Sequence, residues 1–238
     1  MRRSGYPYLT KRPGETHTTM ADHHDATEEY LENILEIEEE GTRVMRARLV
    51  ERLGISAAAV SETVNRLAEQ GYLEVESDRT VTLTDKGRTL ATKVMRRHRL
   101  AERLLIDVIG LEWEKVHREA DRWEHVISDD VEEKLIELLG DPATCPHGNP
   151  IPGSKRERRV EPTVPLAGLT EGAVTVNRIS EKLELDDEGL RFVAKARLIP
   201  GCTATISARV DDGIRVTTAT GEFTVPVRVA EQLHVTLQ

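Results

Sequence analysis

The first part of the chain alternates between apolar patterns of helical period and glycines that interrupt them. From residue 26 to residue 40, apolar side chains recur every three or four positions, and Gly41 follows. This spacing predicts a helix that ends at the glycine. Residues 46–53 predict a short amphipathic helix stopped by Gly54. After it, Ser56 is placed to cap a second helix that runs to about residue 70.

Two short stretches with strand-like alternation follow these helices. Residues 72–75 and 80–83 alternate apolar and polar side chains, and the turn-forming segment 76–79 lies between them. A helix, a short helix, a turn, a helix and a hairpin in this order predict a winged helix-turn-helix.

The remainder divides into a helical part, a proline-rich part and a β-rich part. Residues 85–109 predict a long basic helix and 112–139 one or two more, with more apolar surface than one helix pair would hide. We therefore expect a homodimer. Residues 146–165 hold five prolines and two glycines, which is the composition of a linker. The runs beyond it predict a small β-barrel with a helix inserted at 187–196: 173–179, 197–199, 203–210, 214–218 and 224–229. Residues 1–22 have no apolar period and predict a disordered arm.

Charge is distributed unevenly along the 238 residues. The net charge of −9 divides into −6 over residues 1–40, +5 over 41–103 and −8 over 104–145, while the rest is balanced. The one basic block contains the second and third helices and the hairpin of the predicted winged helix-turn-helix, which indicates that this part binds double-stranded DNA. An aromatic content of 3% argues against a single-strand binder, because such proteins stack bases on exposed rings.

Cysteine count and hydropathy exclude two further classes. Cys145 and Cys202 cannot form a CxxC zinc site or a disulfide framework, so we expect a cytoplasmic protein. No apolar run approaches the roughly 18 residues that span a bilayer, and we expect no membrane partner.

Histidines and carboxylates gather on the predicted helices of the acidic block and just before it. Asp121 precedes Glu124 by three residues and His125 by four, so all three can project from one helix face, and His117 lies one turn earlier. Upstream, His98 and Glu102 form another pair four residues apart, and Glu29 on the first helix could add an oxygen. Nitrogen and oxygen donors without sulfur favour Mn²⁺ or Fe²⁺ over tetrahedral Zn²⁺.

Other interpretations of these residues stay open at this point. The same side chains could form solvated salt bridges, with Arg118 and Arg122 as partners. They could also belong to a metal-binding enzyme or buffer that uses the winged helix for protein interactions, or to a regulator that senses an organic ligand. No HExxH pattern, no nucleophile with its base and no glycine-rich phosphate loop is present, so we expect no enzymatic activity and no small organic substrate.

Six motifs between residues 27 and 153 carry most strongly a resemblance to a known family, which covers nearly the whole chain after residue 25. They are Thr27-Glu-Glu-Tyr30, Arg46-Ala-Arg-Leu-Val-Glu-Arg-Leu53, His98-Arg-Leu-Ala-Glu-Arg-Leu-Leu105, Lys115-Val-His117, Arg122-Trp-Glu-His125 and Gly148-Asn-Pro-Ile-Pro-Gly153. By these motifs the sequence resembles the diphtheria toxin repressor family, which includes the iron-dependent regulators and their manganese-responsive relatives.

The resemblance implies a mainly α-helical fold with a small β domain. Its parts would be a winged helix-turn-helix domain (23–85), a helical dimerisation and metal-binding domain (86–145), the linker, and an SH3-like barrel (166–238). It also implies a metal-dependent transcriptional repressor that binds palindromic operators and controls metal homeostasis genes, with Mn²⁺ or Fe²⁺ as co-repressor.

The resemblance further implies two metal sites per subunit. The primary site would hold Glu29, Asp121, Glu124 and His125, and the ancillary site His98, Glu102 and His117 with help from the barrel. The matching barrel positions are Asp186 and Gly189, and because glycine has no side-chain oxygen, Glu188 is taken as its substitute. Glu29 and Asp121 stand where iron-responsive members have methionine and cysteine, and this replacement of sulfur by oxygen favours Mn²⁺ over later transition metals.

Small side chains begin the predicted recognition helix. Ser56, Ala58 and Ser61 would let it seat deeply in the major groove with modest direct readout. Most of the affinity would then come from phosphate contacts by basic residues around it, namely Arg46, Arg48, Arg66 and Arg79.

Overall fold

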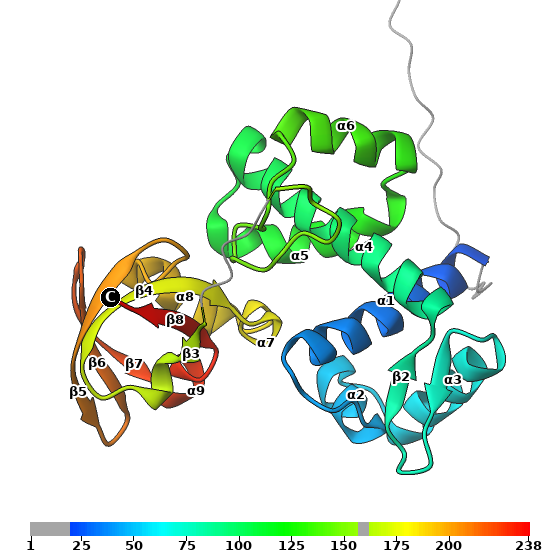
Figure 1. The fold of residues 1–238 in the computed structure, drawn as a ribbon, viewed down its shortest axis with the longest axis horizontal. Helices are drawn as coiled ribbons and strands as arrows, with labels where there is room; N and C mark the ends of the chain where they lie inside the picture. Colours follow the sequence, from blue (N-terminus) through cyan, green and yellow to red (C-terminus); the bar gives the residue numbers. More distant parts are fainter. Residues whose placement is uncertain (1–19, 157–161) are drawn as a thin grey trace, which may run out of the picture.

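The structure is a computed structural model that describes residues 20–156 and 162–238, with side chains from residue 26 onward. Most of the predicted arm (1–19) and residues 157–161 of the predicted linker lie outside the described residues. The fold is mainly α-helical with a small β domain, as predicted (Figure 1). Three separate hydrophobic clusters divide the described residues into an N-terminal, a middle and a C-terminal unit.

The N-terminal unit is the predicted winged helix-turn-helix. The Ser56 hydroxyl accepts a hydrogen bond from the Ala59 amide at 3.2 Å and thereby caps the second helix of the motif, and Gly54 ends the helix before it at a φ of 65°. The elements are α1 (Met20–Glu39), α2 (Arg46–Leu53), α3 (Ala57–Glu69), β1 (Leu73–Val75) and β2 (Val81–Leu83), with the two strands antiparallel.

Helix α4 (Asp85–Leu104) joins the N-terminal unit to the middle unit. Ala91 and Met95 on its first half pack into the N-terminal cluster, and Leu100 on its second half packs into the middle cluster. The predicted long helix ends in a π-helical turn, η1 (Leu105–Ile109). The middle unit continues with η2 (Trp113–Lys115), α5 (Val116–Trp123), η3 (Glu124–Val126) and α6 (Asp129–Leu139).

The C-terminal unit is a six-stranded antiparallel sheet in the order β3-β8-β4-β5-β6-β7, curled around one apolar core. The strands are β3 (Val164–Pro165), β4 (Gly172–Ile179), β5 (Thr203–Val210), β6 (Gly213–Thr218), β7 (Gly221–Pro226) and β8 (Leu233–Leu237). The helices are η4 (Leu166–Gly168), α7 (Glu181–Glu184), α8 (Asp187–Ala196) and α9 (Val227–Ala230). Helix α7 lies on the side of this unit that faces α1 and α2 (Figure 1).

Three predictions for the C-terminal part were wrong in detail. Residues 197–199 are not a strand, because Arg197 adopts a left-handed φ of 56° and ends α8. The predicted strand 224–229 stops at Pro226, where α9 takes over. Strand β8 and helix α7 were not predicted, although Leu233–Leu237 alternates apolar and polar residues; helix α7 is only four residues long.

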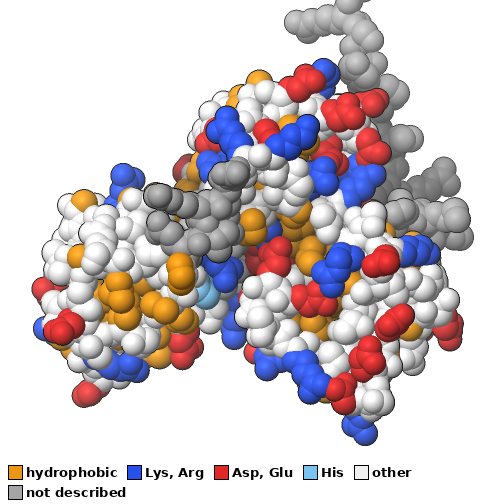
Figure 2. All heavy atoms as spheres, viewed as in Figure 1, with side chains coloured by type: hydrophobic (Ala, Val, Ile, Leu, Met, Phe, Trp, Pro, Cys, Tyr) orange, Lys and Arg blue, Asp and Glu red, His pale blue; other side chains and the backbone are white. Residues whose placement is uncertain are grey.

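Part of the predicted linker is buried. Residues 144 and 150 form a β-bridge, and within the loop between them His147 and Asn149 are almost completely buried. The prolines and glycines of this segment therefore shape a tight packed loop (Thr144–Pro150). On the face drawn in Figure 2, a hollow separates the β domain from the helical units. Within the described part of the chain, no helix is both long and apolar enough to cross a membrane.

Gly87 in α4 allows the helix to approach the segment between α3 and β1 closely. A Cβ atom at this position would lie 2.1 Å from the carbonyl oxygen of Tyr72, which is backbone and cannot rotate away. We expect Gly87→Ala to lower the free energy of unfolding by about 1–3 kcal/mol, as overpacking does. Urea unfolding followed by circular dichroism measures the change. Gly168→Ala is the control, because nothing lies within 4 Å of its Cβ, and equal stability of the two variants would contradict the prediction.

Candidate metal centre

Helices α4 and α5 bring three of the predicted ancillary ligands into contact. His98 and Glu102 lie one turn apart on α4, and His117 lies on the facing side of α5. The Nε2 atom of His98 is 3.0 Å from Nδ1 of His117, and Glu102 Oε1 is 3.5 Å from each of these nitrogens. All three side chains are buried. The fold thus brings these three side chains together.

The C-terminal unit and the Thr144–Pro150 loop add further donors to this group. Glu184 of α7 places Oε2 3.0 Å from Nδ1 of His117 and 2.8 Å from Nδ1 of His147. The same His147 nitrogen lies 2.9 Å from Oε1 of Glu102. Cys145 joins Glu102 and His147 in a second group of donor atoms within 4.8 Å of one another. We call His98, Glu102, His117, His147 and Glu184 the inner cluster.

Burial and charge act in opposite directions in the inner cluster. Burial on its own would lower the pKa of His98, His117 and His147, yet the neighbouring carboxylates raise each pKa well above its ordinary value of 6.5. Burial would likewise raise the pKa of Glu102, and the histidines bring it well below the usual range. In the protein without metal, protons on the imidazoles therefore balance the carboxylate charge. This contribution to stability is complete below pH 6.5 and is lost as the pH rises through the raised values.

The donor set fits a divalent cation. Glu102 Oε2 is buried and has no hydrogen-bond partner among the described residues. Such orphaned buried oxygens are rare and indicate a missing partner. Imidazole nitrogens and carboxylate oxygens about 3 Å apart also match neighbouring ligands of one ion, whose bonds to these atoms are about 2.1 Å long. The residues of the inner cluster could thus hold an ion in place of the protons.

A second group lies on the side of α1. Glu32 of α1, Nδ1 of His98 and Glu124 of η3 have donor atoms within 4.8 Å of one another, and all three residues are buried. Glu32 and Glu124 border a cavity of about 330 Å³ that Glu29, Asp121 and His125 also line. We call Glu29, Glu32, Asp121, Glu124 and His125 the α1 cluster.

The predicted primary ligands differ in how deeply they are buried. Glu124 is buried, whereas Glu29 and Asp121 are more exposed at the cavity. Burial raises the pKa of Glu29; His125 lowers it, while Glu124 and Asp121 raise it further. His125 Nδ1 pairs with Glu28 at 2.8 Å, a contact that the sequence did not indicate. All four predicted residues line the same cavity.

The predicted barrel ligands are elsewhere. Asp186 caps α8 by accepting hydrogen bonds from the amides of Glu188 and Gly189 at 3.2 and 3.0 Å. Both Asp186 and Glu188 pair with Arg228 on the far side of this turn. The inner cluster instead receives its C-terminal carboxylate from Glu184 of α7, and Glu181, three residues earlier on the same helix face, lies beside His117 and Glu184.

Four functional candidates were missed by the sequence analysis. Glu32 lies three residues after Glu29, so helical spacing alone could have found it. Cys145 is considered above only for a CxxC site or a disulfide framework, and His147 falls within the predicted linker, although a histidine two residues after a cysteine is a possible ligand pair. Glu184 had no local signal, because only the fold brings α7 to α4.

The predicted DNA-contact residues lie on the winged helix-turn-helix. Ser56 and Ala58 are exposed at the start of α3, and Ser61 is half-buried one turn later. Arg79 is exposed at the tip of the hairpin, where its φ is 70°. Arg46 donates a hydrogen bond to Asn65 of α3 at 2.8 Å, and Arg66 is half-buried on α3.

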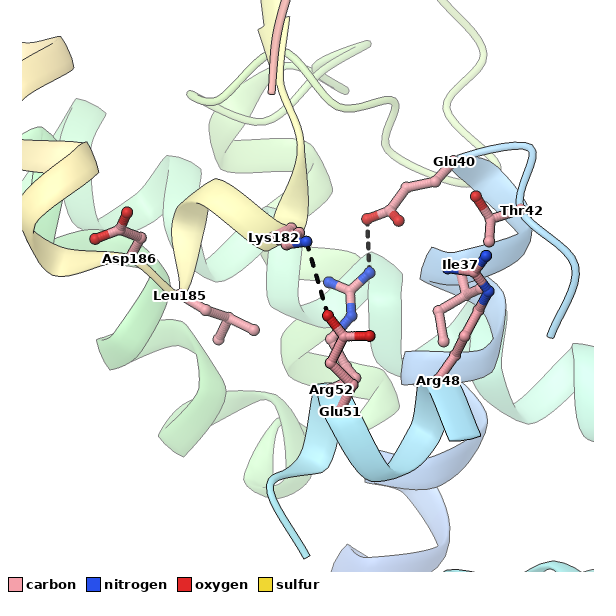
Figure 3. Close-up of a pocket in the computed structure, with 9 residues that line it drawn as sticks. All are labelled: Ile37, Glu40, Thr42, Arg48, Glu51, Arg52, Lys182, Leu185 and Asp186. Atoms are coloured by element: carbon pink, nitrogen blue, oxygen red, sulfur yellow. Dashed lines mark hydrogen bonds and ion pairs between the residues drawn. The ribbon is translucent and has the colours of Figure 1, made fainter. Parts of the chain in front are cut away.

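Arg48 faces another way. It lies two residues from Arg46 and therefore projects from nearly the opposite side of α2. It lines a crevice of about 320 Å³ between α2 and α7 (Figure 3). In the same crevice Arg52 donates to Glu40 at 2.6 Å, and Lys182 lies 3.9 Å from Glu51. We therefore leave Arg48 out of the proposed DNA contacts.

Comparison with known proteins places this geometry in a family. Residues 22–81 match the family described as "Iron dependent repressor, N-terminal DNA binding domain", and residues 84–153 match "Iron dependent repressor, metal binding and dimerisation domain". The chain is 44% identical to the iron-dependent repressor IdeR of Mycobacterium tuberculosis over 223 residues, which cover 89% of this chain and 96% of the relative.

Two further comparisons cover different lengths. The chain is 57% identical to the diphtheria toxin repressor of Corynebacterium diphtheriae over 134 residues, or 56% of this chain and 59% of the relative. A solved structure described as a manganese-dependent transcriptional repressor in complex with manganese is 32% identical. It superimposes with a TM-score of 0.76, over 89% of this chain and all of that one.

The raised pKa values of the inner-cluster histidines predict a pH-dependent affinity for metal. Each imidazole that binds an ion must first lose its proton, so the apparent Mn²⁺ affinity should rise with pH through the neutral range, by about tenfold per pH unit for each proton displaced. Isothermal titration calorimetry in two buffers of different ionisation enthalpy counts the protons. Binding heat that is independent of the buffer would contradict the prediction.

Proposed function

Since the chain belongs to the iron-dependent repressor family and is a metal-dependent DNA-binding transcriptional repressor, we propose that its co-repressor is Mn²⁺, with Fe²⁺ as the second candidate, bound at two sites per subunit. The α1 cluster would form the primary site and the inner cluster the ancillary site. The family consists of repressors rather than enzymes. The observation that carries the proposal is that the Glu32, His98 and Glu124 donors lie within 4.8 Å, because these residues come from both the N-terminal and the middle unit.

The chemistry of the primary site favours Mn²⁺. Its donors are the carboxylates of Glu29, Asp121 and Glu124 and the imidazole of His125, with Glu32 beside them. Hard oxygen ligands suit Mn²⁺ and lower the advantage of later transition metals. In the names of the relatives both iron and manganese occur. Fe²⁺ shares the preference for mixed oxygen and nitrogen ligands, which keeps it as the alternative.

Neutralisation of the acidic groups explains how metal would act on DNA binding. Without a cation, Glu29, Asp121 and Glu124 repel one another across the cavity between α1 and the middle unit. Side chains from α1, α5 and η3 that bind one ion together would hold α1 against the middle unit and fix the orientation of the winged helix-turn-helix. By linkage, DNA must then strengthen metal binding by the same factor.

A second copy of the chain completes the repressor, since the family domain is one of dimerisation. Large apolar side chains remain exposed on η1 and α6, where a partner subunit would cover them: Val108, Ile109, Val131 and Leu138. A twofold pair of winged helices fits a palindromic operator. We propose that the regulated genes serve metal homeostasis, because occupancy of the sites would report the metal supply.

On the DNA side, we propose that α3 enters the major groove. Ser56, Ala58 and Ser61 would contact the bases, and Arg46, Arg66 and Arg79 the phosphates. An alternative from another class, a metal buffer, has no use for an arginine exposed at the hairpin tip.

Glu29→Ala should remove the metal response and leave the fold intact, because the side chain is exposed at the cavity and supports no core. We expect the Mn²⁺ stimulation of DNA binding to fall by at least about tenfold, the loss that even an outer partner of a ligand causes. Fluorescence anisotropy on an operator selected from a randomised duplex library measures it. Glu188→Ala is the matched control, since this carboxylate pairs with Arg228 instead, and a full Mn²⁺ response in Glu29→Ala would refute the assignment.

Arg79→Ala tests the phosphate contact at the hairpin tip. Loss of one phosphate contact should weaken binding to all duplex sequences to a similar degree and reduce the slope of log affinity against log salt by about 1. Binding to the selected operator and to random duplex at several salt concentrations provides the slopes. Arg215→Ala on β6 serves as the control. A change confined to one base pair would show that Arg79 reads sequence.

A further inference from the structure

The Thr144–Pro150 loop is held between α4 and the β domain. Arg103 of α4 donates a hydrogen bond to the carbonyl oxygen of the first loop residue at 2.7 Å, and Arg99 of α4 donates one to that of the last. Between these ends, the carbonyl oxygen of His147 accepts a hydrogen bond from the amide of Ile179, at the end of β4, at 3.0 Å. The loop therefore joins the helix of the inner cluster to the strand that leads into α7.

Gly148 lets the loop lie this close to β4. Its φ is 88°, and a Cβ atom there would lie 2.1 Å from the carbonyl oxygen of Asn177 and 2.8 Å from Cα of Arg178. Both are backbone atoms of β4, which cannot rotate away, so only glycine fits. Gly148 opens the motif Gly148-Asn-Pro-Ile-Pro-Gly153, which the proposed function leaves without a role. The close approach buries the next side chain, Asn149, between the loop and the β domain.

Three partners fix the side-chain amide of Asn149. Its Nδ2 donates to the carbonyl oxygen of Ile179 at 3.1 Å and to Oε1 of Glu184 at 2.8 Å, and its Oδ1 accepts from Nη1 of Arg178 at 3.3 Å. A carbonyl oxygen and a carboxylate can only accept, and a guanidinium can only donate, so one orientation of the amide satisfies all three. One N–H group of Asn149 thus holds a carboxylate of the inner cluster.

The contact with Asn149 decides which oxygen of Glu184 faces the inner cluster. Oε1 is engaged by Asn149, and Oε2 is the oxygen that lies 2.8 Å from Nδ1 of His147 and 3.0 Å from Nδ1 of His117. Helix α7 has only four residues, too few to be rigid without support from its surroundings. Carboxylates that bind a metal are commonly held by a hydrogen bond from an outer partner. Asn149 is in the place of such a partner.

We propose that Asn149 is a positioning residue of the inner cluster, which presents Oε2 of Glu184 to the bound cation and so makes the β domain part of that site. The inference rests on the proposed function, in that the inner cluster must bind a cation. Loss of an outer partner commonly weakens metal binding by about 10- to 100-fold, and we expect a loss of this size. A purely structural role would lower the stability of the metal-free protein and leave the Kd of the site unchanged.

Trp113 reports on the inner cluster, because its ring contacts the His147 ring with centroids 4.5 Å apart. The full chain with Trp123→Phe keeps Trp113 as its only tryptophan. In this background, quenching of the fluorescence by Mn²⁺ yields the Kd of the inner cluster for each variant, and native mass spectrometry counts the bound ions. Urea unfolding in the presence of a chelator measures the stability of the metal-free protein.

Two single substitutions alter the contact from either side. In Asn149→Asp the side chain keeps its size and its oxygen toward Arg178, but it has no N–H group and turns a second oxygen toward Glu184. In Glu184→Gln the new amide must offer its carbonyl oxygen to the N–H group of Asn149, so it turns its own N–H group, which cannot bind a metal, toward the cluster. We expect each substitution to weaken Mn²⁺ binding at the inner cluster by at least about tenfold.

The two substitutions together reverse the polarity of the contact. The carboxylate at position 149 then accepts a hydrogen bond from the amide N–H group at position 184, which leaves the carbonyl oxygen of that amide facing the cluster as a ligand. We therefore expect the double variant to bind Mn²⁺ more tightly than either single variant, whereas independent effects would add. The comparison of the double variant with Glu184→Gln stands whether or not Asn149→Asp folds by itself.

Ser180→Ala is the matched control. Ser180 is about as buried as Asn149 and directly precedes α7, but its hydroxyl donates to Oε1 of Gln232 within the β domain, at 2.6 Å. We expect this variant to lower the stability of the metal-free protein and to leave the Kd of the inner cluster unchanged. Equal weakening of Mn²⁺ binding in Ser180→Ala and Asn149→Asp would show that both act by loosening the β domain, and would overturn the inference.

The other outcomes are distinguishable. An unchanged Kd in Asn149→Asp would overturn the role of Asn149 and leave the proposed function intact. So would a double variant that fails to fold or binds no more tightly than Glu184→Gln. One bound ion without any response of Trp113 in the otherwise unaltered protein would place no cation in the inner cluster and overturn the inference. No bound ion at all would overturn the proposed function as well.

Discussion

The burial of opposite charges along α4 is the constraint on which the rest of the molecule depends. His98, Glu102, His117, His147 and Glu184 are all buried, and an uncompensated charge in such a place costs several kcal/mol. The group is tolerable only while every member keeps its partner. Since these partners come from the middle unit, the Thr144–Pro150 loop and the β domain, the arrangement of the units and the integrity of the cluster depend on each other.

Helix α4 converts this constraint into a link to the DNA-binding unit. Its first half belongs to the N-terminal core, and its second half carries His98 and Glu102. Arg99 lies between them, fully buried, and pairs with Glu39 of α1 at 2.7 Å and Glu181 of α7 at 2.8 Å. The same turn of α4 thus contacts both outer units. A change in charge at this turn therefore acts on the C-terminal end of α1, which leads into the rest of the winged helix-turn-helix.

Local periodicity explains which parts of this arrangement were predictable. The pair His98 and Glu102 and the group around Asp121 follow from helical spacing, and the winged helix-turn-helix follows from its glycines and caps. Glu184 and His147 could not be found in this way, because their contacts with α4 join residues that are distant in the sequence. The assignment of Asp186 and Glu188 differs from the structure for a related reason. Helices α7 and α8 follow each other closely here, so a shift of a few residues along the sequence moves a carboxylate from α7, which faces α4, to the start of α8.

The two clusters differ in chemistry, and this difference bears on the metal response. The α1 cluster is rich in carboxylates and opens to a cavity, so it suits a hard ion that exchanges with solvent. The inner cluster has three buried imidazoles and a thiol beside it in Cys145, whose pKa burial raises to about 12. That thiol stays protonated unless a cation displaces its proton. Softer ions therefore gain more at the inner cluster than at the α1 cluster, and an ion that fills only the inner cluster leaves the repulsion next to α1 unrelieved. A response specific to Mn²⁺ or Fe²⁺ then depends on the site that joins α1 to the middle unit, which is the site whose ligands are oxygen.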